Sequence, residues 1–358
     1  MAKNVKILTI NPGSTSTKIA LFEGENNVFQ KNLKHSSEEL APFEKIADQF
    51  EFRKNVILNV LKEEGIAIDD IAYIVGRGGL VKPIASGIYE VNDALLADLR
   101  KGVQGEHASN LGGLIAADLA AQIGAKAYIA DPVVVDELQD VARISGHPAF
   151  ERISIFHALN QKAIARTYAK ENGKKYEDLN LIVAHLGGGI SVAAHEKGKA
   201  IDVNNALDGD GPFSPERSGG LPVGSLVKAC FSGQYTLPQL KKMICGQGGY
   251  VGYLNTNDAY DVEVKAKDGD AKAAMIQEAM VYQVAKEIGA MATVLKGKVD
   301  AILVTGGIAY GKPFVESLKE KVSFIAPVAV YPGEDEMKAL AMNAVMLDQG
   351  ELTAKVYC

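Results

Sequence analysis

Short apolar runs rich in β-branched residues alternate along the chain with longer stretches of helical periodicity. The runs predict strands at 5–10, 17–22, 71–75, 126–130, 180–186, 190–196, 199–203, 300–305 and 322–326. Helical patterns lie between them near 42–62, 107–122, 157–170, 222–244 and 312–320. Alternation of this kind favours an α/β architecture.

Two segments of the chain share one plan. Residues 8–29 run from a strand through a tight glycine turn to a second strand, and through another glycine turn to a third. Residues 181–203 repeat that order roughly 175 residues later, which suggests two similar domains. A chain of 358 residues also fits about two domains. We therefore expect a duplicated α/β fold with a cleft between its domains: 1–150 plus 335–358 form the first domain, and 151–334 form the second.

The segment 271–296 is apolar around most of its circumference, unlike an ordinary surface helix. This pattern predicts a buried helix at a domain or subunit contact. Its methionines are the kind of flexible side chain that fills irregular core space. The segment permits a homo-oligomer without requiring one.

Charge and cysteine usage limit the partners and the compartment. The net charge of −6 does not suggest a nucleic-acid or anionic-membrane surface, so any phosphate site must be a local concentration of donors. Three widely spaced cysteines form no disulfide framework and no zinc spacing. No apolar run reaches about 18 residues, so no membrane span is predicted. We expect a cytoplasmic protein that binds neither nucleic acid nor membrane.

A polar turn interrupts the first strand pair at residues 11–18, NPGSTSTK. Gly13 can adopt a positive φ, and successive N–H groups in such turns form an anion-binding nest. The hydroxyls of the four following residues add donors, and the side-chain oxygen of Asn11 could reach a metal-bound water. A plain β-hairpin is an equally good interpretation of this stretch alone.

Two further glycine clusters follow strands. Gly187, Gly188 and Gly189 come after 180–186, and three glycines are tolerated where a ligand or backbone must approach closely. The stretch 306–312, GGIAYGK, has the spacing of a P-loop, but Pro313 stands where a P-loop needs Ser or Thr. The stretch 306–312 remains a candidate shelf for a ribose or a phosphate. For the triple glycine, the alternative interpretation is a tight bend of the backbone.

Several charged residues stand at strand ends or helix starts. Arg77 lies between glycines after a buried run, and Arg217 lies in a flexible polar loop, so both are candidate anion clamps. His157 opens a helix, and Asp131 ends a strand. A helix cap or a satisfied core residue is the alternative for each of these two. Acidic residues at 334–336 open the last helix, where the helix dipole already favours them.

These parts together resemble the acetokinase family, within the superfamily of actin-like ATPases and sugar kinases. The resemblance covers essentially the whole chain in order. Its motifs are ILTINPGSTSTKIALF, VGRGGL, YIADPVVVDEL, ISIFHALNQKAIAR, LIVAHLGGGISVAA, PERSGGLP, VTGGIAYGKPFVESL and YPGEDEMKALAMNAV. It implies an actin-like, ribonuclease H-like duplicated fold and reversible transfer of the ATP γ-phosphoryl group to a short-chain carboxylate.

The resemblance also implies roles for positions of this chain. Mg²⁺ would be served by Asn11 and by Asp335 or Glu336. Arg77 and Arg217 would clamp the carboxylate and the transferring phosphoryl group, His157 would bind the phosphoryl group, and Asp131 would order the site. The residues implied to contact ATP or ADP are Gly13, Ser14, Thr15, Ser16, Lys18, His185, Gly187, Gly188, Gly189, Asp258, Gly306, Gly307 and Ile308.

Three features depart from acetate kinase. Gly188 replaces an asparagine, Asp258-Ala259-Tyr260 replaces Asp-Phe-Arg near the adenine, and the chain is shorter. All three fit the butyrate branch of the family better, so butyrate or a branched short-chain acid is the expected substrate and the acyl phosphate the product. An actin-like ATPase or sensor without a carboxylate substrate, or a sugar kinase of the same superfamily, is the alternative.

Overall fold

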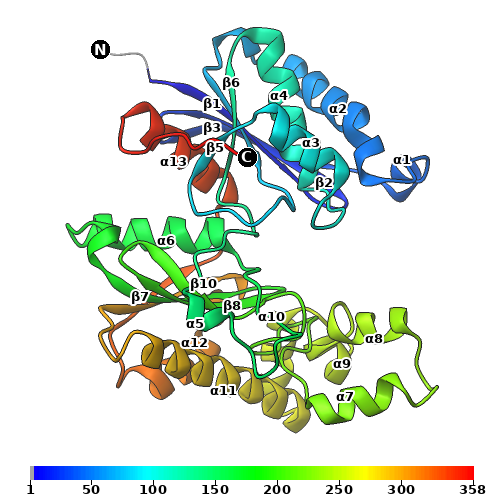
Figure 1. The fold of residues 1–358 in the computed structure, drawn as a ribbon, viewed down its shortest axis with the longest axis vertical. Helices are drawn as coiled ribbons and strands as arrows, with labels where there is room; N and C mark the ends of the chain where they lie inside the picture. The colour runs from blue at the N-terminus through cyan, green and yellow to red at the C-terminus, as the bar shows by residue number, and fades with distance from the viewer. Residues whose placement is uncertain (1–3) are drawn as a thin grey trace. The chain divides into compact units, whose positions relative to one another are not determined.

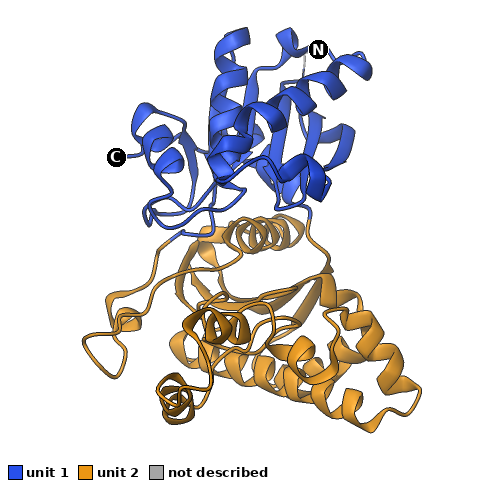
Figure 2. Ribbon diagram, turned by 90° about the vertical axis from the view of Figure 1, so that its right-hand side faces the viewer, with its two compact units in different colours: residues 1–135, 335–358 blue, residues 136–334 orange. Residues whose placement is uncertain are grey.

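The computed structural model describes residues 4–358 (Figure 1). The chain divides into two compact units, unit 1 (Met1–Val135 with Asp335–Cys358) and unit 2 (Asp136–Glu334) (Figure 2). Unit 2 begins earlier than the expected boundary near residue 150, because the Gln139 N–H donates to Ile201 O, 3.0 Å away, and joins this segment to unit 2. The domain limits expected from the sequence stay a prediction.

Unit 1 is built on a six-stranded sheet with the order β3-β2-β1-β4-β6-β5. Its strands are β1 (Lys6–Pro12), β2 (Ser16–Glu23), β3 (Asn26–Lys34), β4 (Tyr73–Arg77), β5 (Ile88–Glu90) and β6 (Lys126–Ala130). Its α-helices are α1 (Ser37–Leu40), α2 (Phe50–Glu63), α3 (Asp93–Lys101), α4 (Asn110–Ile123) and α13 (Glu336–Asp348). The first three strands are antiparallel, and β4 and β6 run parallel to β1.

Side-chain alternation along β4 directs Arg77 toward α13. A Cβ on Gly76 would lie 2.2 Å from Gly112 O of α4, so this face of β4 meets the α4 backbone directly. Tyr73 and Arg77 point to the other face, because successive strand residues alternate. There the Tyr73 hydroxyl donates to Asp348 of α13 over 3.0 Å. The two ends of α13 therefore contact side chains of one strand.

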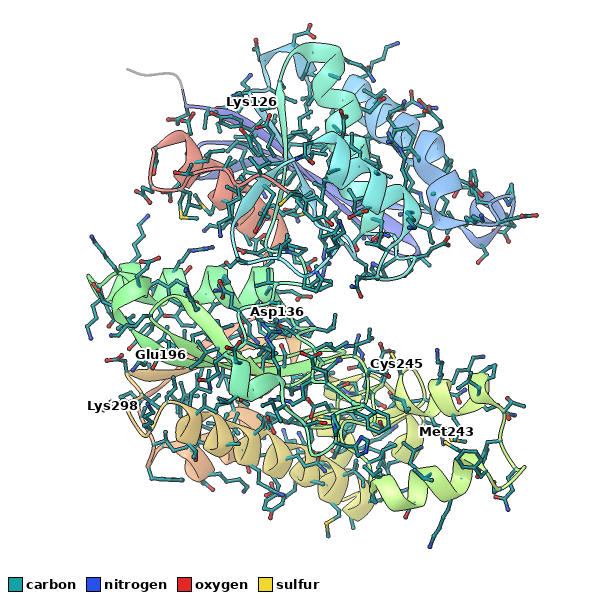
Figure 3. The ribbon with its side chains drawn as sticks, in the orientation of Figure 1. Lys126, Asp136, Glu196, Met243, Cys245 and Lys298 are labelled. Atoms are coloured by element: carbon teal, nitrogen blue, oxygen red, sulfur yellow. The ribbon has the colours of Figure 1, made fainter. Side chains whose placement is uncertain are left out.

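Unit 2 is built on a five-stranded sheet with the order β11-β10-β7-β8-β9. Its strands are β7 (Asn180–Leu186), β8 (Ile190–Glu196), β9 (Lys199–Val203), β10 (Ala301–Gly306) and β11 (Val328–Pro332). Its α-helices are α5 (Asp140–Arg143), α6 (Ala158–Glu171), α7 (Val223–Cys230), α8 (Leu237–Ile244), α9 (Gly249–Leu254), α10 (Ala259–Lys267), α11 (Ala271–Val294) and α12 (Lys312–Val322). Figure 3 labels Glu196 and Lys298 at the end of this sheet away from the β7–β8 turn.

The unit 2 sheet has a core on each face. Residues of α6 pack on one face with Leu181, Val183 and Leu303. Residues of α11 and α12 pack on the other face with alternate residues of the same strands, such as Ile182 and Val304. The expected apolar helix is thus α11, and its buried stripe belongs to this core. Two of its large side chains, Met275 and Tyr282, are more than half exposed, at 68% and 56%.

The internal repeat predicted from the sequence is present in the structure. In both sheets three antiparallel strands are followed by two strands parallel to the first, as the two strand orders show when one is reversed. Irregular pairing falls at corresponding places, between Leu21 and Phe22 of β2 and between Ala194 and His195 of β8. When the two hairpins are aligned by their strand pairing, Asn11 of β1 and His185 of β7 occupy corresponding positions, each one residue before the end of its strand.

Two sequence predictions of secondary structure were wrong. The run 322–326 is the end of α12 and a turn, and the strand begins at Val328, directly after Pro327. A proline disfavours helical backbone in the residue before it, which separates the two elements. The stretch 222–244 forms two helices, α7 and α8, because the chain turns at Gly233 with φ +75°. The short strand β5 and the helix α3 were not predicted.

Candidate active site

The β1–β2 hairpin of unit 1 ends in the turn Gly13–Ser16. Pro12 pairs with Thr17, and the Gly13 N–H donates to Ser16 O over 2.7 Å. Ser14 and Thr15 are exposed at the tip of this turn. The exposed Lys18 lies opposite Asn11 on the neighbouring strand. The turn therefore presents hydroxyls and one cation to solvent, as the sequence predicts.

A fully buried arginine on α2 supports this turn from behind. The Nη1 of Arg53 donates to Gly13 O over 2.7 Å and to Ser16 O over 3.0 Å, and its Nη2 donates to Ser14 O over 3.0 Å. Gln49 Oε1 accepts from both Nε and Nη2. Three carbonyl oxygens of the turn are thereby directed inward. Nothing in the sequence singles out Arg53.

Asn11, Arg77 and Glu336 come together in unit 1. Arg77 Nη1 lies 2.6 Å from Glu336 Oε1 and 3.4 Å from Asn11 Oδ1. The Asn11 amide donates to the second carboxylate oxygen of Glu336. This cluster joins β1, β4 and the first turn of α13. The cluster forms because the alternation of side chains along β4 places Arg77 on the face toward α13.

The two acidic candidates at the start of α13 differ in their contacts. Asp335 is the N-cap, and its Oδ1 accepts from the Lys338 N–H over 2.9 Å. Glu336 turns toward Arg77 and Asn11 instead. Among residues 4–358, no group of three or more His, Cys, Asp or Glu side chains is arranged to hold a metal ion. A metal here would need ligands from a substrate or from water as well.

Asp131 is buried at the end of β6 in an unusual backbone conformation. Its φ is +39°, which is uncommon for a residue other than glycine and costs conformational energy. Its Oδ1 accepts from the Ser86 hydroxyl over 2.6 Å and from the Gly87 N–H over 2.8 Å. The carboxylate therefore holds the loop before β5.

His107, which the sequence analysis missed, lies near Arg77. Partial desolvation and the Arg77 charge lower the pKa of His107.

The β7–β8 hairpin of unit 2 ends in Gly187, Gly188 and Gly189. A Cβ on Gly189 would lie 2.0 Å from Arg217 Nη1 and 3.3 Å from His157 Cε1, so both side chains cross this glycine. Gly188 is exposed, and the nearest atom to a Cβ there is 3.8 Å away. The surrounding side chains therefore leave no room for a Cβ at Gly189, whereas Gly188 has room for one. The structure brings His157, Arg217 and the triple glycine together.

Arg217 has a buried donor that nothing in the described chain satisfies. Its Nη1 donates to Ala206 O over 2.7 Å, but its buried Nε has no hydrogen-bond partner within residues 4–358. A buried unsatisfied donor costs about 1–3 kcal/mol. An anion bound beside this glycine turn would satisfy the donor. The anion-clamp interpretation of Arg217 fits this geometry.

His157 and His185 stack on one another with ring centroids 3.8 Å apart. The Nδ1 of His157 lies 2.8 Å from Ser191 Oγ, and the Nδ1 of His185 lies 2.9 Å from Asn160 Oδ1. The Nε2 of His185 faces Glu334 at 3.5 Å. Each ring is therefore oriented by a neutral polar side chain. The sequence singled out both histidines but neither of the residues that orient them.

The expected nucleotide shelf follows β10. Gly306 has φ +90°, and a Cβ there would lie 2.3 Å from Leu186 O, whereas a Cβ on Gly307 would meet no atom within 4 Å. Gly306 and Gly333 exchange two backbone hydrogen bonds of 3.0 and 2.9 Å. Ile308 is only 7% exposed and packs into the core, so its side chain is not available to a ligand. The exposed Asp258 caps α10.

The duplicated sheets, each with a glycine-containing hairpin after its first strand, define the actin-like ATPase fold. A solved acetate kinase from Porphyromonas gingivalis has this fold, with a TM-score of 0.77 at 20% identity over 96% of this chain and 99% of that chain. A propionate kinase from Francisella tularensis gives 0.72 at 19% identity over 95% and 98%. The actin-like fold expected from the sequence is confirmed.

Similarity in sequence defines the family. The acetokinase family model matches residues 152–325. Butyrate kinase 2 of Clostridium acetobutylicum is 59% identical over 352 residues, which cover 98% of this chain and 99% of that protein. Butyrate kinase 1 of the same organism is 58% identical over the same shares of each chain. The chain belongs to the acetokinase family. No helix within residues 4–358 is long and apolar enough to cross a membrane.

Proposed function

We propose that the chain transfers the γ-phosphoryl group of ATP reversibly to butyrate or a branched short-chain acid and forms the acyl phosphate and ADP. The observation that carries this proposal is the buried, unsatisfied Nε of Arg217 beside His157 and Gly189. A phosphoryl group in transfer carries negative charge on its equatorial oxygens and needs such donors. The relatives named butyrate kinase support the choice of acid.

In unit 2 we assign His157 and Arg217 to the phosphoryl group. Gly187, Gly188 and Gly189 let the ATP phosphates approach the backbone, and His185 holds the His157 ring by stacking. The shelf at Gly306 and Gly307 borders the nucleoside through its backbone, with the exposed Asp258 as its further boundary. The buried side chain of Ile308 supports this shelf from the core.

In unit 1 we assign Arg77 to the substrate carboxylate and the turn Gly13–Ser16 with Lys18 to phosphate oxygens. Asp131 keeps the loop at Ser86 and Gly87 in place. Glu336 and Asn11 offer carboxylate and amide oxygens, the ligands that Mg²⁺ accepts when substrate phosphates and water complete its shell. We assign this role to Glu336 because it lies beside Asn11, whereas the Asp335 carboxylate faces the first turn of α13 as its N-cap. Bound Mg²⁺ would offset charge on the phosphates.

The chemistry needs no general base. A carboxylic acid with a reference pKa near 4 is ionised at neutral pH and is already a nucleophile. The protein's task is to hold two anions together and to neutralise charge in the transition state. Two arginines and a histidine suit that task, whereas a neutral sugar would leave one arginine without a partner. A hydroxyl acceptor would also require a base.

The direct test is phosphorylation assayed with Mg²⁺-ATP and hydroxylamine, which traps an acyl phosphate as its hydroxamate. Acetate, butyrate, isobutyrate and a hexose are compared. We expect hydroxamate with butyrate or isobutyrate well above acetate. ATP turnover that no acid changes, without hydroxamate, would overturn the proposal in favour of an ATPase, and hexose-dependent ADP release would favour a sugar kinase.

A matched pair of variants tests the role of Arg217 in that assay. Arg217→Lys keeps the positive charge but loses the planar donor geometry at Nε, and should lower kcat by about 10²–10³. Arg100→Lys changes an exposed arginine of α3 and should leave kcat within about twofold. Equal activity of the two variants would remove Arg217 from the phosphoryl site.

A further inference from the structure

A row of buried hydrogen-bonded side chains lies beneath α6 in unit 2. Along β8, Val192 and Ala194 face the α11 core, whereas Ser191 and His195 alternate to the α6 face. Ser191, His195 and Gln161 of α6 are each 0% exposed. Polar groups buried so completely are rare unless every donor and acceptor is matched. We call the four residues Tyr176, His195, Gln161 and Ser191 the buried relay.

We propose that the buried relay fixes the neutral His157 ring as the tautomer that carries its proton on Nε2. The role of His157 toward the phosphoryl group rests on the proposed function, but the tautomer itself does not. Ser191 and Gln161 are on this view positioning residues. They do not contact the substrate, and they decide which ring nitrogen can donate to it.

The direction of the hydrogen bonds follows from one carbonyl. Gln161 Nε2 lies 3.1 Å from Ser191 O and 2.9 Å from Ser191 Oγ. A carbonyl oxygen can only accept, so the amide NH₂ of Gln161 must face Ser191. The Gln161 Oε1 then faces His195 Nε2 at 2.9 Å, and this nitrogen must carry a proton to donate.

The other side of His195 agrees with that assignment. Burial, together with the nearby charges of Lys162 and Arg166, holds the pKa of His195 well below its usual range, so the ring is neutral. A neutral ring protonated on Nε2 accepts at Nδ1. The Tyr176 hydroxyl lies 2.6 Å from Nδ1 and donates to it. The His195 ring then accepts a hydrogen bond at Nδ1 and donates one from Nε2, so both of its nitrogens have a partner of the right kind.

The same logic continues to His157. Ser191 Oγ accepts from the Gln161 amide and, over 3.5 Å, from the His157 backbone N–H, and its own hydroxyl proton can be donated to His157 Nδ1, 2.8 Å away. A ring that accepts at Nδ1 carries its proton on Nε2. That nitrogen can donate to a phosphoryl oxygen. The other tautomer would present a lone pair to the same oxygen and repel it.

The first experiment measures the tautomer in the full chain without substrate. The protein is labelled with ¹⁵N-histidine, and long-range ¹H–¹⁵N spectra distinguish protonated from unprotonated ring nitrogens. The His157 signals are assigned by their loss in His157→Gln. We expect Nε2 of neutral His157 to be protonated and Nδ1 to be unprotonated. A protonated Nδ1 in the wild type would overturn the proposal.

Two variants test the cause of this tautomer. Ser191→Ala removes the hydroxyl and should give a mixture of His157 tautomers, with kcat lowered about 10-fold, as the loss of one hydrogen bond allows. Ser191→Thr keeps a hydroxyl and should retain the Nε2 tautomer. Circular dichroism and the thermal midpoint show whether each variant is folded. Ser191→Ala with an unchanged, single Nε2 tautomer would also overturn the proposal, and the wild-type spectrum decides it if neither variant folds.

The outcomes separate this inference from the proposed function. Nε2 protonation without any acid-dependent hydroxamate would leave the buried relay intact and remove the carboxylate kinase activity. Hydroxamate formation with Nδ1 protonated would leave the activity intact and remove the relay.

Discussion

The two hairpins of this chain share a strand plan but not a way of holding their turns. The turn Gly13–Ser16 is fixed from behind, because buried Arg53 takes up three of its carbonyl oxygens. The turn Gly187–Gly189 is held differently: the buried Ser214 hydroxyl donates to one carbonyl oxygen, that of Gly188, and Arg217 crosses over Gly189. The first turn is therefore shaped by the arginine beneath its carbonyl oxygens. The second is shaped mainly by the arginine side chain that passes over Gly189.

This difference separates the roles that side chains and backbone play in an anion site. In the first turn the hydroxyl residues keep their side chains as donors, and a buried arginine organises the backbone. In the second turn the glycines give up side-chain donors, so that neighbouring side chains can occupy the space above the backbone. Substitutions should therefore affect the first hairpin through stability and the second through rate.

The largest expected effect is loss of stability in Arg53→Met. The variant removes a buried cation and leaves the oxygens of Gly13, Ser14 and Ser16 with fewer donors. We expect a loss of about 3–5 kcal/mol in the free energy of unfolding, measured by urea denaturation.

Arg53→Lys and Arg100→Met are the controls for that comparison. A lysine keeps the charge but offers fewer fixed donors, so it should recover part of the loss. Arg100 is exposed on α3, and its change should cost less than about 0.5 kcal/mol. If Arg53→Met and Arg100→Met have the same stability, the first turn does not depend on support from behind.

The second largest effect is expected on the rate, at Gly189 of the β7–β8 turn, where Arg217 passes over the backbone. In Gly189→Ala the new methyl group must displace Arg217, so kcat should fall by about 10²-fold, as when one transition-state donor is lost. In Gly188→Ala the methyl group meets no atom within 3.8 Å, and kcat should stay within about threefold. Steady-state kinetics with butyrate measures both. Equal losses would mean that the turn backbone, and not the space above Gly189, controls the rate.

The sequence predicted those parts of each hairpin that depend on neighbours along the chain. Short apolar runs rich in β-branched residues predicted β1, β2, β7 and β8, and the glycines predicted both turns. Arg53 could not be found in this way. Its partners lie 37 to 40 residues earlier, and an arginine within a helix is usually a solvated surface residue.

The same limit applies to the candidate site. The start of α13 was predicted to be acidic, but the choice between Asp335 and Glu336 depends on Arg77, which lies 259 residues earlier and faces α13 only through the folding of β4. The buried relay left a weaker trace, a serine and a histidine within the apolar run 190–196. The wrong strand at 322–326 shows the converse, because apolar composition alone did not distinguish the last turn of a helix from a strand.

A third prediction concerns the glycines of the shelf beside the second hairpin. Gly306→Ala combines a positive φ with a Cβ 2.3 Å from Leu186 O, at the end of β7, and should cost about 2–3 kcal/mol of stability. Gly307→Ala has open space around it and should cost less than about 1 kcal/mol. Urea denaturation compares the two. A shelf that tolerated alanine at both positions would not be braced by β7.

The smallest expected effect is a pH dependence that comes from one carboxyl group of unit 2. Burial, and then the charges of Asp210 and Asp202 against those of Arg152 and Lys286, raises the pKa of Glu287 on α11 to about 7. Its ordinary value is about 4.5, so the folded chain binds more protons here than the unfolded chain between these two values. The stability contributed by this carboxyl is therefore fully present below about pH 4.5 and is lost as the pH rises toward 7.

The variant Glu287→Gln isolates that contribution, because it keeps the shape of the protonated acid and cannot ionise. At pH 5 it should match the wild type, and at pH 8 it should be more stable by about 1–2 kcal/mol. The control Glu320→Gln removes one carboxylate at an exposed position of α12, in the same unit, and should not reproduce this pattern. Urea midpoints at the two values of pH measure the difference. Because Asp210 lies in the loop that leads to Arg217, a stabilised variant with unchanged kcat would separate the support of that loop from the chemistry in front of Gly189.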